Sequence, residues 1–341
     1  MTSTSRELVQ QTLSFGYPAR VPRQLWLLPW ANIHHPKMVQ KIQHRFPDDI
    51  VSAPAALTRP LQTAGDAYTV GRYVDEWGCV FDNIQAGMIG EVKQPLLKNW
   101  DERELIRLPR ERLSLDREAI NSFCESTDQF VVSAFFPRPF ERLQFIRGAE
   151  NLYYDLISHP EELEQLLHRL HNFYQEEMAR WAETKVDALM FMDDWGSQHS
   201  TLISPELWRR LFKPLYRDYI DIAHSAGKYA FMHSDGHILA IIPDLVELGL
   251  DALNSQISCM GIEELGVKFG GKLTFWGELD RQRLLPDGTA AMIVEETRQM
   301  QEHLYHNGGV IAQCEFGPGA NPENVYTYFE TWEAVHREKR K

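Results

Sequence analysis

The sequence predicts a single (β/α)8 barrel, on two observations. In the second half of the chain, short apolar runs alternate regularly with helical stretches and with Gly or Pro breaks. Strand and helix repeated in this way give parallel strands joined by crossover helices. In addition, no low-complexity linker, charge block or internal repeat divides the 341 residues, which favours one domain over residues 1–341. A doubly wound parallel sheet is the rival architecture.

The first half of the chain is less regular, but it supplies three expected strands. These are QLWLLPW (24–30), a stretch near EWGCVFD (76–82) and QFVVSAFF (129–136). Helices are expected in MTSTSRELVQQTL at the N-terminus and in PEELEQLLHRLHNFYQEEMARWAE, which precedes the second half.

Five further strands are expected in the second half. They are DALMFMDD (187–194), KYAFMHSD (228–235), LDALNSQ (250–256), KLTFWGELD (272–280) and GVIAQCE (309–315). The clearest helix between them is SPELWRRLFKPLYRDYIDIAHSAG, where Ser204 precedes Pro205 and Glu206 as a helix cap would. Roughly eight strands in about 300 residues suit the barrel.

Composition excludes several classes of partner. The chain has 35 Lys and Arg against 48 Asp and Glu, a formal charge of −13, and its basic residues are scattered, so nucleic acid is not an expected partner. No run approaches the roughly 18 apolar residues of a membrane span, and no signal peptide pattern is present, which predicts a soluble cytoplasmic protein acting on a small molecule. No glycine-rich phosphate motif supports a nucleotide cofactor.

Each of the five later strands ends in residues with chemical capability. The pairs are Asp193 and Asp194, His233 and Asp235, Asn254 and Gln256, Glu278 and Asp280, and Cys314 and Glu315. In a parallel barrel these ends meet at one face, where barrel enzymes place their active sites. Any one polar strand end is explained by contact with water alone, but five in succession favour a site.

The stretch FMHSDGHI raises the question of a metal site. His233 and Asp235 alternate on a strand, so both side chains point to the same side, as two ligands or an acid/base pair require; His237 is expected to cap the next helix or face solvent. Together with the thiolate of Cys314 they would form a three-ligand zinc site with an open fourth position, the mark of a catalytic metal. The structural alternatives are that His233 is a core histidine held by a hydrogen bond and that Cys314 is a buried structural cysteine.

Other strand-end residues are candidates for catalysis or substrate binding. Asp193 and Asp194 are candidate general bases, but as neighbours on a strand they point to opposite sides, so only one is expected to face the pocket. Asn254 and Gln256 are expected to contact the substrate. Glu278 is a candidate catalytic residue and fourth zinc ligand.

Three further residues near strand ends are candidate substrate contacts. Trp26 and Trp195 would wall an aromatic pocket, although aromatic residues in barrels more often serve packing. Arg138 would bind an anionic group or form a salt bridge at the start of a helix.

Several segments resemble the uroporphyrinogen decarboxylase superfamily, and more closely its branch of corrinoid- and thiol-dependent methyltransferases and their uncharacterised relatives. These segments are DEWGCVFD, RPFERLQFIRGAENLYYDL, MDDWGSQHSTLISPELWRRLFKPLYRDYI, FMHSDGHILAIIPDLVELGLDALNSQ, FWGELDRQRLLPDGT and GGVIAQCEFGPGANPENV. The resemblance covers nearly the whole chain and implies a single (β/α)8 barrel of the uroporphyrinogen decarboxylase type.

The methyltransferase branch implies a zinc cofactor. Its members hold zinc with an H-x-C pair at the end of one strand and a Cys at the end of the last, and the metal activates a thiol that attacks a methyl group on a cobalt corrinoid. Here His233 and Cys314 match, and Asp235 takes the middle position. The resemblance thus implies a zinc-dependent methyltransferase that moves a methyl group between a corrinoid, or a small methyl donor, and a thiol-type acceptor, with a corrinoid protein as a candidate partner.

Two alternatives to the methyltransferase remain. One is a metal-free lyase or decarboxylase with Asp and His as proton donors. The arginine-rich loop of the decarboxylase branch, however, reads VPRQLWLLPWANIHHP here, and Arg23 is the single arginine of that stretch. The other is a non-catalytic barrel that binds a corrinoid or tetrapyrrole, which would need none of His233, Asp235 and Cys314.

Overall fold

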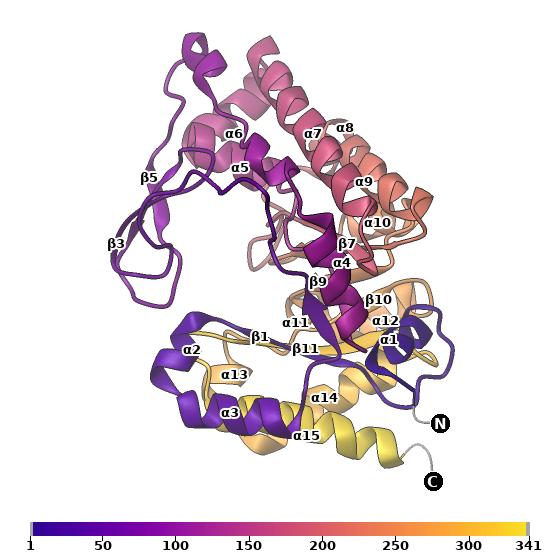
Figure 1. Ribbon diagram of the computed structural model, residues 1–341. Coiled ribbons are helices and arrows are strands. Elements are labelled where there is room, and N and C mark those ends of the chain that lie inside the picture. Colours follow the sequence, from indigo (N-terminus) through magenta and orange to yellow (C-terminus); the bar gives the residue numbers. More distant parts are fainter. Residues whose placement is uncertain (1–2, 339–341) are drawn as a thin grey trace.

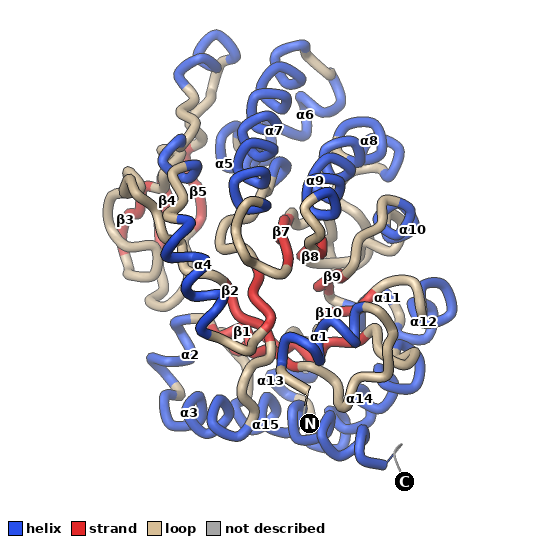
Figure 2. Tube along the Cα trace, turned by 45° about the vertical axis from the view of Figure 1, so that its right-hand side comes forward, coloured by secondary structure: helices blue, strands red, loops and turns tan. Residues whose placement is uncertain are grey.

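Eight parallel strands form a nearly closed barrel surrounded by helices (Figure 2). The computed structural model describes residues 3–338, with the side chains of residues 3–335. The strands follow one another around the barrel in the order β1 (Arg23–Leu27), β11 (Val310–Phe316), β10 (Thr274–Trp276), β9 (Ala252–Ser255), β8 (Tyr229–Ser234), β7 (Ala188–Met192), β6 (Phe130–Val132) and β2 (Ile50–Ser52).

The first and last strands of this order meet at a seam. There the amide of Asp49 donates to the Arg23 carbonyl at 2.9 Å and the Gln24 side chain donates to the Ile50 carbonyl at 3.2 Å. The (β/α)8 prediction is therefore confirmed, and the doubly wound sheet is excluded.

Helices cover the outside of the barrel in chain order. They are α2 (Pro29–His34), α3 (Pro36–Arg45), α4 (Arg117–Ser126), α5 (Pro139–Arg147), α6 (Ala149–Ser158), α7 (Glu161–Ala182), α8 (Pro205–Leu211), α9 (Lys213–Ser225), α10 (Ile242–Glu247), α11 (Ile257–Met260), α12 (Ile262–Phe269), α13 (Leu284–Asp287), α14 (Ala290–Leu304) and α15 (Pro322–Glu338). Ser204 caps α8, as predicted, by accepting from the Leu207 amide. The one long helix expected after it is two, because the chain turns at Phe212 before Pro214, which has no N–H to donate. Among residues 3–338, no helix is long and apolar enough to cross a membrane.

The first helix, α1 (Ser5–Leu13), closes the amino-terminal opening of the barrel. Its capping box joins Thr4 and Glu7. Its residues Val9 and Leu13 pack in the same cluster as side chains that point into the barrel. The helix therefore leaves the carboxyl ends of the strands as the open mouth.

An inserted segment between β2 and β6 forms a separate antiparallel sheet, at the left of Figure 1. Its strands are β3 (Gly71–Val74), β4 (Val80–Asn83) and β5 (Glu91–Gln94), followed by two short 3-10 helices, Trp100–Leu105 and Arg110–Leu113. The prediction of a barrel strand near residues 76–82 is wrong, because this stretch contributes β4 to the insertion. The barrel uses the shorter β2 instead, which the sequence analysis missed.

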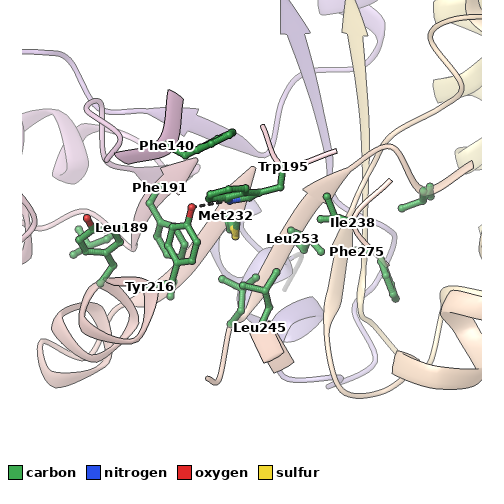
Figure 3. Close-up of a cluster of buried hydrophobic side chains, with 14 of the residues drawn as sticks. Phe140, Leu189, Phe191, Trp195, Tyr216, Met232, Ile238, Leu245, Leu253 and Phe275 are labelled. Atoms are coloured by element: carbon green, nitrogen blue, oxygen red, sulfur yellow. Dashed lines mark hydrogen bonds between the residues drawn. The ribbon is translucent and has the colours of Figure 1, made fainter. Parts of the chain in front are cut away.

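Side chains of the barrel strands alternate between two apolar clusters. Ile50, Phe130, Met190, Phe231 and Ile311 are among those that fill the barrel interior. Their strand neighbours face the helices, where they meet apolar residues of the helical layer: Figure 3 shows Phe140, Leu189, Phe191, Trp195, Tyr216, Met232, Ile238, Leu245, Leu253 and Phe275. Because the alternation has a period of two, it decides which strand-end residue faces the mouth.

Candidate metal centre at the barrel mouth

Three residues at the ends of β7 and β8 bring potential metal ligands together. Asp194, His233 and Asp235 each offer one ligand atom, and these atoms lie within 4.8 Å of one another. Nε2 of His233 is 3.5 Å from Oδ1 of Asp194 and 3.6 Å from Oδ1 of Asp235. All three follow the inward-facing positions of their strands, so the strand alternation itself assembles the group.

Asn254 of β9 fixes the orientation of the His233 ring. Nδ1 of His233 lies 2.5 Å from Oδ1 of Asn254, while the amide nitrogen of Asn254 donates to the Trp276 carbonyl. Because the Asn254 oxygen can only accept, Nδ1 carries the proton and Nε2 is left to face the two aspartates. A histidine ligand whose second nitrogen donates to a neighbouring oxygen is typical of metal sites.

The group of Asp194, His233 and Asp235 stabilises a positive charge. Burial acts to lower the pKa of His233, but the hydrogen bond to Asp194 and the charges of Asp235 and Asp194 outweigh it and raise that pKa to about 9. Burial conversely acts to raise the pKa of Asp194, but His233, then the Asp235 amide and then Arg138 outweigh it, so that pKa is lowered. The space between the two aspartates therefore favours a cation, whether a proton on imidazole or a metal ion.

A second set of charged residues adjoins this group. The guanidinium of Arg281 pairs with Oδ2 of Asp235, lies 3.0 Å from Oε1 of Glu315 and 3.6 Å from Oε2 of Glu278. Glu278 is 2% exposed, and neither of its carboxylate oxygens has a hydrogen-bond partner among the described residues. Its pKa is raised to about 7, chiefly by burial; Arg281 opposes the shift, and Asp235 and Glu315 add to it.

Arg281 and Glu315 are the members of the site that sequence reasoning missed as site residues. Arg281 follows β10 in the stretch FWGELDRQ, three residues after Glu278, and a basic residue in a strand-end loop is a signal that could have identified it. Glu315 directly follows Cys314 in the sequence. Only the phase of the side-chain alternation along β11 decides which of the two points toward the barrel interior.

The structure does not bring Cys314 into the group. Ile311 of β11 packs in the barrel interior, whereas Cys314 packs in the cluster between the strands and the helices and is 1% exposed. Burial raises the pKa of the Cys314 thiol, which disfavours the thiolate that zinc would bind. The expected set of His233, Asp235 and Cys314 is thus replaced by Asp194, His233 and Asp235, because the third ligand was placed on the wrong face of its strand.

Asp193 and Trp195 lie behind the strand, away from the mouth. Asp193 is fully buried and accepts hydrogen bonds from the amides of Phe140 and Glu141 and from the Tyr216 hydroxyl at 2.6–3.0 Å. Trp195 stacks on Phe140, with ring centroids 4.2 Å apart, and donates to the Tyr216 hydroxyl (Figure 3). Neither has the catalytic or substrate-binding position that the sequence suggested; both hold α5 and α9 against the barrel.

The other candidate substrate contacts lie around the mouth. Trp26 is half-buried, with its ring centroid 5.2 Å from that of His233. Arg138 acts on the pKa of Asp194 but is paired with Glu141 at 2.9 Å, the salt bridge given as its alternative. Gln256 accepts from the Gly236 amide at 3.2 Å. It also lines a small pocket of about 30 Å³ with Gln198, Ser258, Cys259, Glu278, Leu279, Asp280, Arg281, Gln282 and Arg283.

Comparisons with known proteins give a family and a fold. Residues 75–336 match the family described as uroporphyrinogen decarboxylase (URO-D). Among solved structures, a methyltransferase from Methanosarcina mazei is similar at a TM-score of 0.68 and 16% identity, over 98% of this chain and 99% of that one. A B12-independent methionine synthase from Shewanella sp. W3-18-1, in complex with selenomethionine, has a TM-score of 0.48 and 12% identity, over 89% of this chain and 86% of that one. No curated protein matches the sequence.

Proposed function

This chain belongs to the uroporphyrinogen decarboxylase family, and from that premise we propose that it is a zinc-dependent methyltransferase acting on a thiol-type acceptor. The observation that carries the proposal is the group of Asp194, His233 and Asp235 at the barrel mouth. The fold shared with a solved methyltransferase supports it. The methyl donor in this proposal is a corrinoid, carried by a partner protein, or a small methylated molecule.

The residues of the group fit a zinc ion. Imidazole nitrogen and carboxylate oxygen are both ordinary zinc ligands, and three protein ligands leave a fourth position for a substrate. Oδ1 of Asp235 is buried and has no hydrogen-bond partner among the described residues, as expected of an oxygen reserved for a ligand. When bound here, zinc would lower the pKa of a thiol in the fourth position.

The side chains of the chain itself would carry the remaining tasks. Asn254 keeps Nε2 of His233 directed at Asp194 and Asp235, and Arg281 pairs with Oδ2 of Asp235. Glu278, with a pKa near 7, is the candidate to take the proton that the thiol releases. The thiolate sulfur then forms a bond to the methyl carbon, and the donor leaves with the electron pair of the bond that breaks.

The test is methyl transfer by protein purified without an affinity tag, loaded with zinc or stripped with a chelator. Consumption of methylcobalamin in the presence of small thiols is followed by absorbance. We expect activity only in the loaded protein, its loss in Asp235→Asn and its retention in Cys314→Ser. A metal-stripped enzyme as active as the loaded one would refute the proposal.

A carboxy-lyase without metal is the second candidate, and the buried Glu278 favours it as a proton donor at neutral pH. A porphyrinogen with many carboxylates fits poorly, because Arg281 is already engaged by three carboxylates and Arg23 is paired with Glu333 at 2.9 Å. Release of CO₂ from a carboxylated substrate by the metal-stripped protein would favour this function over methyl transfer.

A further inference from the structure

Two places for a cation lie side by side at the barrel mouth and share one carboxylate. The first is the space among Asp194, His233 and Oδ1 of Asp235. The second, which we call the guanidinium seat, is formed by Oδ2 of Asp235 with the carboxylates of Glu278 and Glu315, and the side chain of Arg281 fills it.

The guanidinium seat is built for a cation. Arg281 presents Nη2 to Asp235, Nη1 to Glu315 and Nε to Glu278, so all three of its nitrogens face a carboxylate. Glu278 is 2% exposed, and the side chains of Asp235 and Glu315 are 25% and 20% exposed. Three carboxylates so placed repel one another and are poorly solvated, so the seat requires a positive charge.

We propose that Arg281 is a positioning residue that occupies the second of two adjacent cation seats and thereby limits the centre to one divalent ion. By pairing with Oδ2 of Asp235, it also leaves Oδ1 directed at His233, 3.6 Å away. The inference takes from the proposed function only the expectation that the first seat holds a metal.

The donor set predicts what a vacated guanidinium seat would bind. All of its donors are carboxylate oxygens, with no imidazole or thiolate, and such sets suit hard ions such as Mn²⁺. A neutral residue in place of Arg281 should therefore create a Mn²⁺ site. Lysine would keep the charge and should not create one.

The experiment counts Mn²⁺ bound per chain by electron paramagnetic resonance, before and after zinc loading. Zinc-loaded Arg281→Gln is expected to bind one Mn²⁺ per chain more than zinc-loaded wild type, and Mn²⁺ should raise its Tm. Arg281→Met is a second neutral variant in case Arg281→Gln folds poorly. Arg283→Gln is the matched control, because that side chain is 83% exposed and pairs only with Asp280 among the described contacts.

The outcomes separate this inference from the proposed function. An extra Mn²⁺ in the neutral variants that disappears in Arg281→Gln/Glu315→Gln supports the inference, even if the wild type binds no zinc. A folded neutral variant with the wild-type Mn²⁺ count, or an equal gain in Arg281→Lys or Arg283→Gln, overturns it, even if zinc-dependent methyl transfer is found. If neither neutral variant folds with Mn²⁺ present, the seat does not accept a metal and the inference is likewise overturned.

Discussion

The two ends of the barrel differ in how their carboxylates are satisfied. At the amino-terminal end, Asp187 accepts from the Val131 amide at 2.7 Å and from Arg6 at 3.0 Å. At the carboxyl end, Asp235 and Glu278 keep buried oxygens that have no hydrogen-bond partner among the described residues. Since a buried oxygen without a hydrogen-bond partner costs stability, these oxygens are the candidates for binding a ligand at this end of the barrel.

The amino-terminal end repeats its pattern around the barrel. Asp49 accepts from the Arg23 amide at 2.9 Å and from both terminal nitrogens of Arg20 at 2.6 Å. Asp251 accepts from the Ala230 amide at 2.8 Å and pairs with His224. These carboxylates tie the chain to the strand starts, so the same residue type is structural at one end and a candidate ligand at the other.

The largest effect is expected from His233→Ala at the carboxyl end. Removal of the only nitrogen ligand should abolish zinc binding and lower methyl transfer by at least about 100-fold. Calorimetric zinc titration and the methylcobalamin assay measure both effects. Retention of zinc with wild-type affinity would show that His233 is not a zinc ligand.

At the amino-terminal end, Asp49→Ala should lower the free energy of unfolding by about 3 kcal/mol, because it removes the carboxylate that pairs with Arg20 and accepts from the Arg23 amide. Urea unfolding measures this, and zinc affinity should not change in the same variant. Asp82→Ala, which breaks only an exposed pair with Arg72, is the control and should alter stability little. Loss of zinc binding in Asp49→Ala would contradict a purely structural role for the carboxylates of the amino-terminal end.

A smaller effect is expected from Asn254→Ala, which removes the group that orients His233. Loss of such an outer partner typically weakens metal affinity by about 10–100-fold. Zinc competition against a chromophoric chelator gives the value. An unchanged affinity would mean that the ring is held by packing against Trp26 and not by Asn254.

The smallest effect concerns Asp48, a carboxylate of the amino-terminal end that is incompletely satisfied. Burial raises its pKa to about 7, despite a hydrogen bond from the Leu25 amide. The folded state therefore binds the proton of the Asp48 carboxyl more tightly than the unfolded state does. The contribution of this group to the free energy of unfolding is complete below about pH 4 and is lost as the pH rises through about 7.

Asp48→Asn should remove that pH dependence and raise stability at pH 8 more than at pH 5, because asparagine still accepts from Leu25 but carries no charge. Urea unfolding of both proteins at pH 5 and pH 8 tests this. Equal stability of the two proteins at both pH values would contradict the raised pKa.

The barrel could be predicted from the sequence because its strands alternate with helices in the second half of the chain. The error at residues 76–82 has a physical cause: β4 alternates half-buried and buried residues, so its sequence has the two-residue period of a strand that covers an apolar core. The true second strand, Ile50–Ser52, has three residues, too few for a period to be seen.

The site could be predicted only where the phase of a strand was clear. His233 and Asp235 lie two residues apart and point together whatever the phase, and the expectation that one of Asp193 and Asp194 would face the mouth agrees with the structure. The expectation that Cys314 joins His233 and Asp235 disagrees with the structure, because a shift of one residue exchanges the two faces of β11. The pairing of Arg281 with three carboxylates depends on loop geometry that no spacing in the sequence encodes.

We propose that the carboxyl end holds a metal ion between Asp194, His233 and Asp235. Anomalous X-ray scattering at the zinc edge, from a crystal grown with zinc, would locate such an ion. One peak is expected within bonding distance of His233 Nε2 and of both aspartates. A peak at Cys314, or crystals whose only zinc lies on the surface, would contradict it.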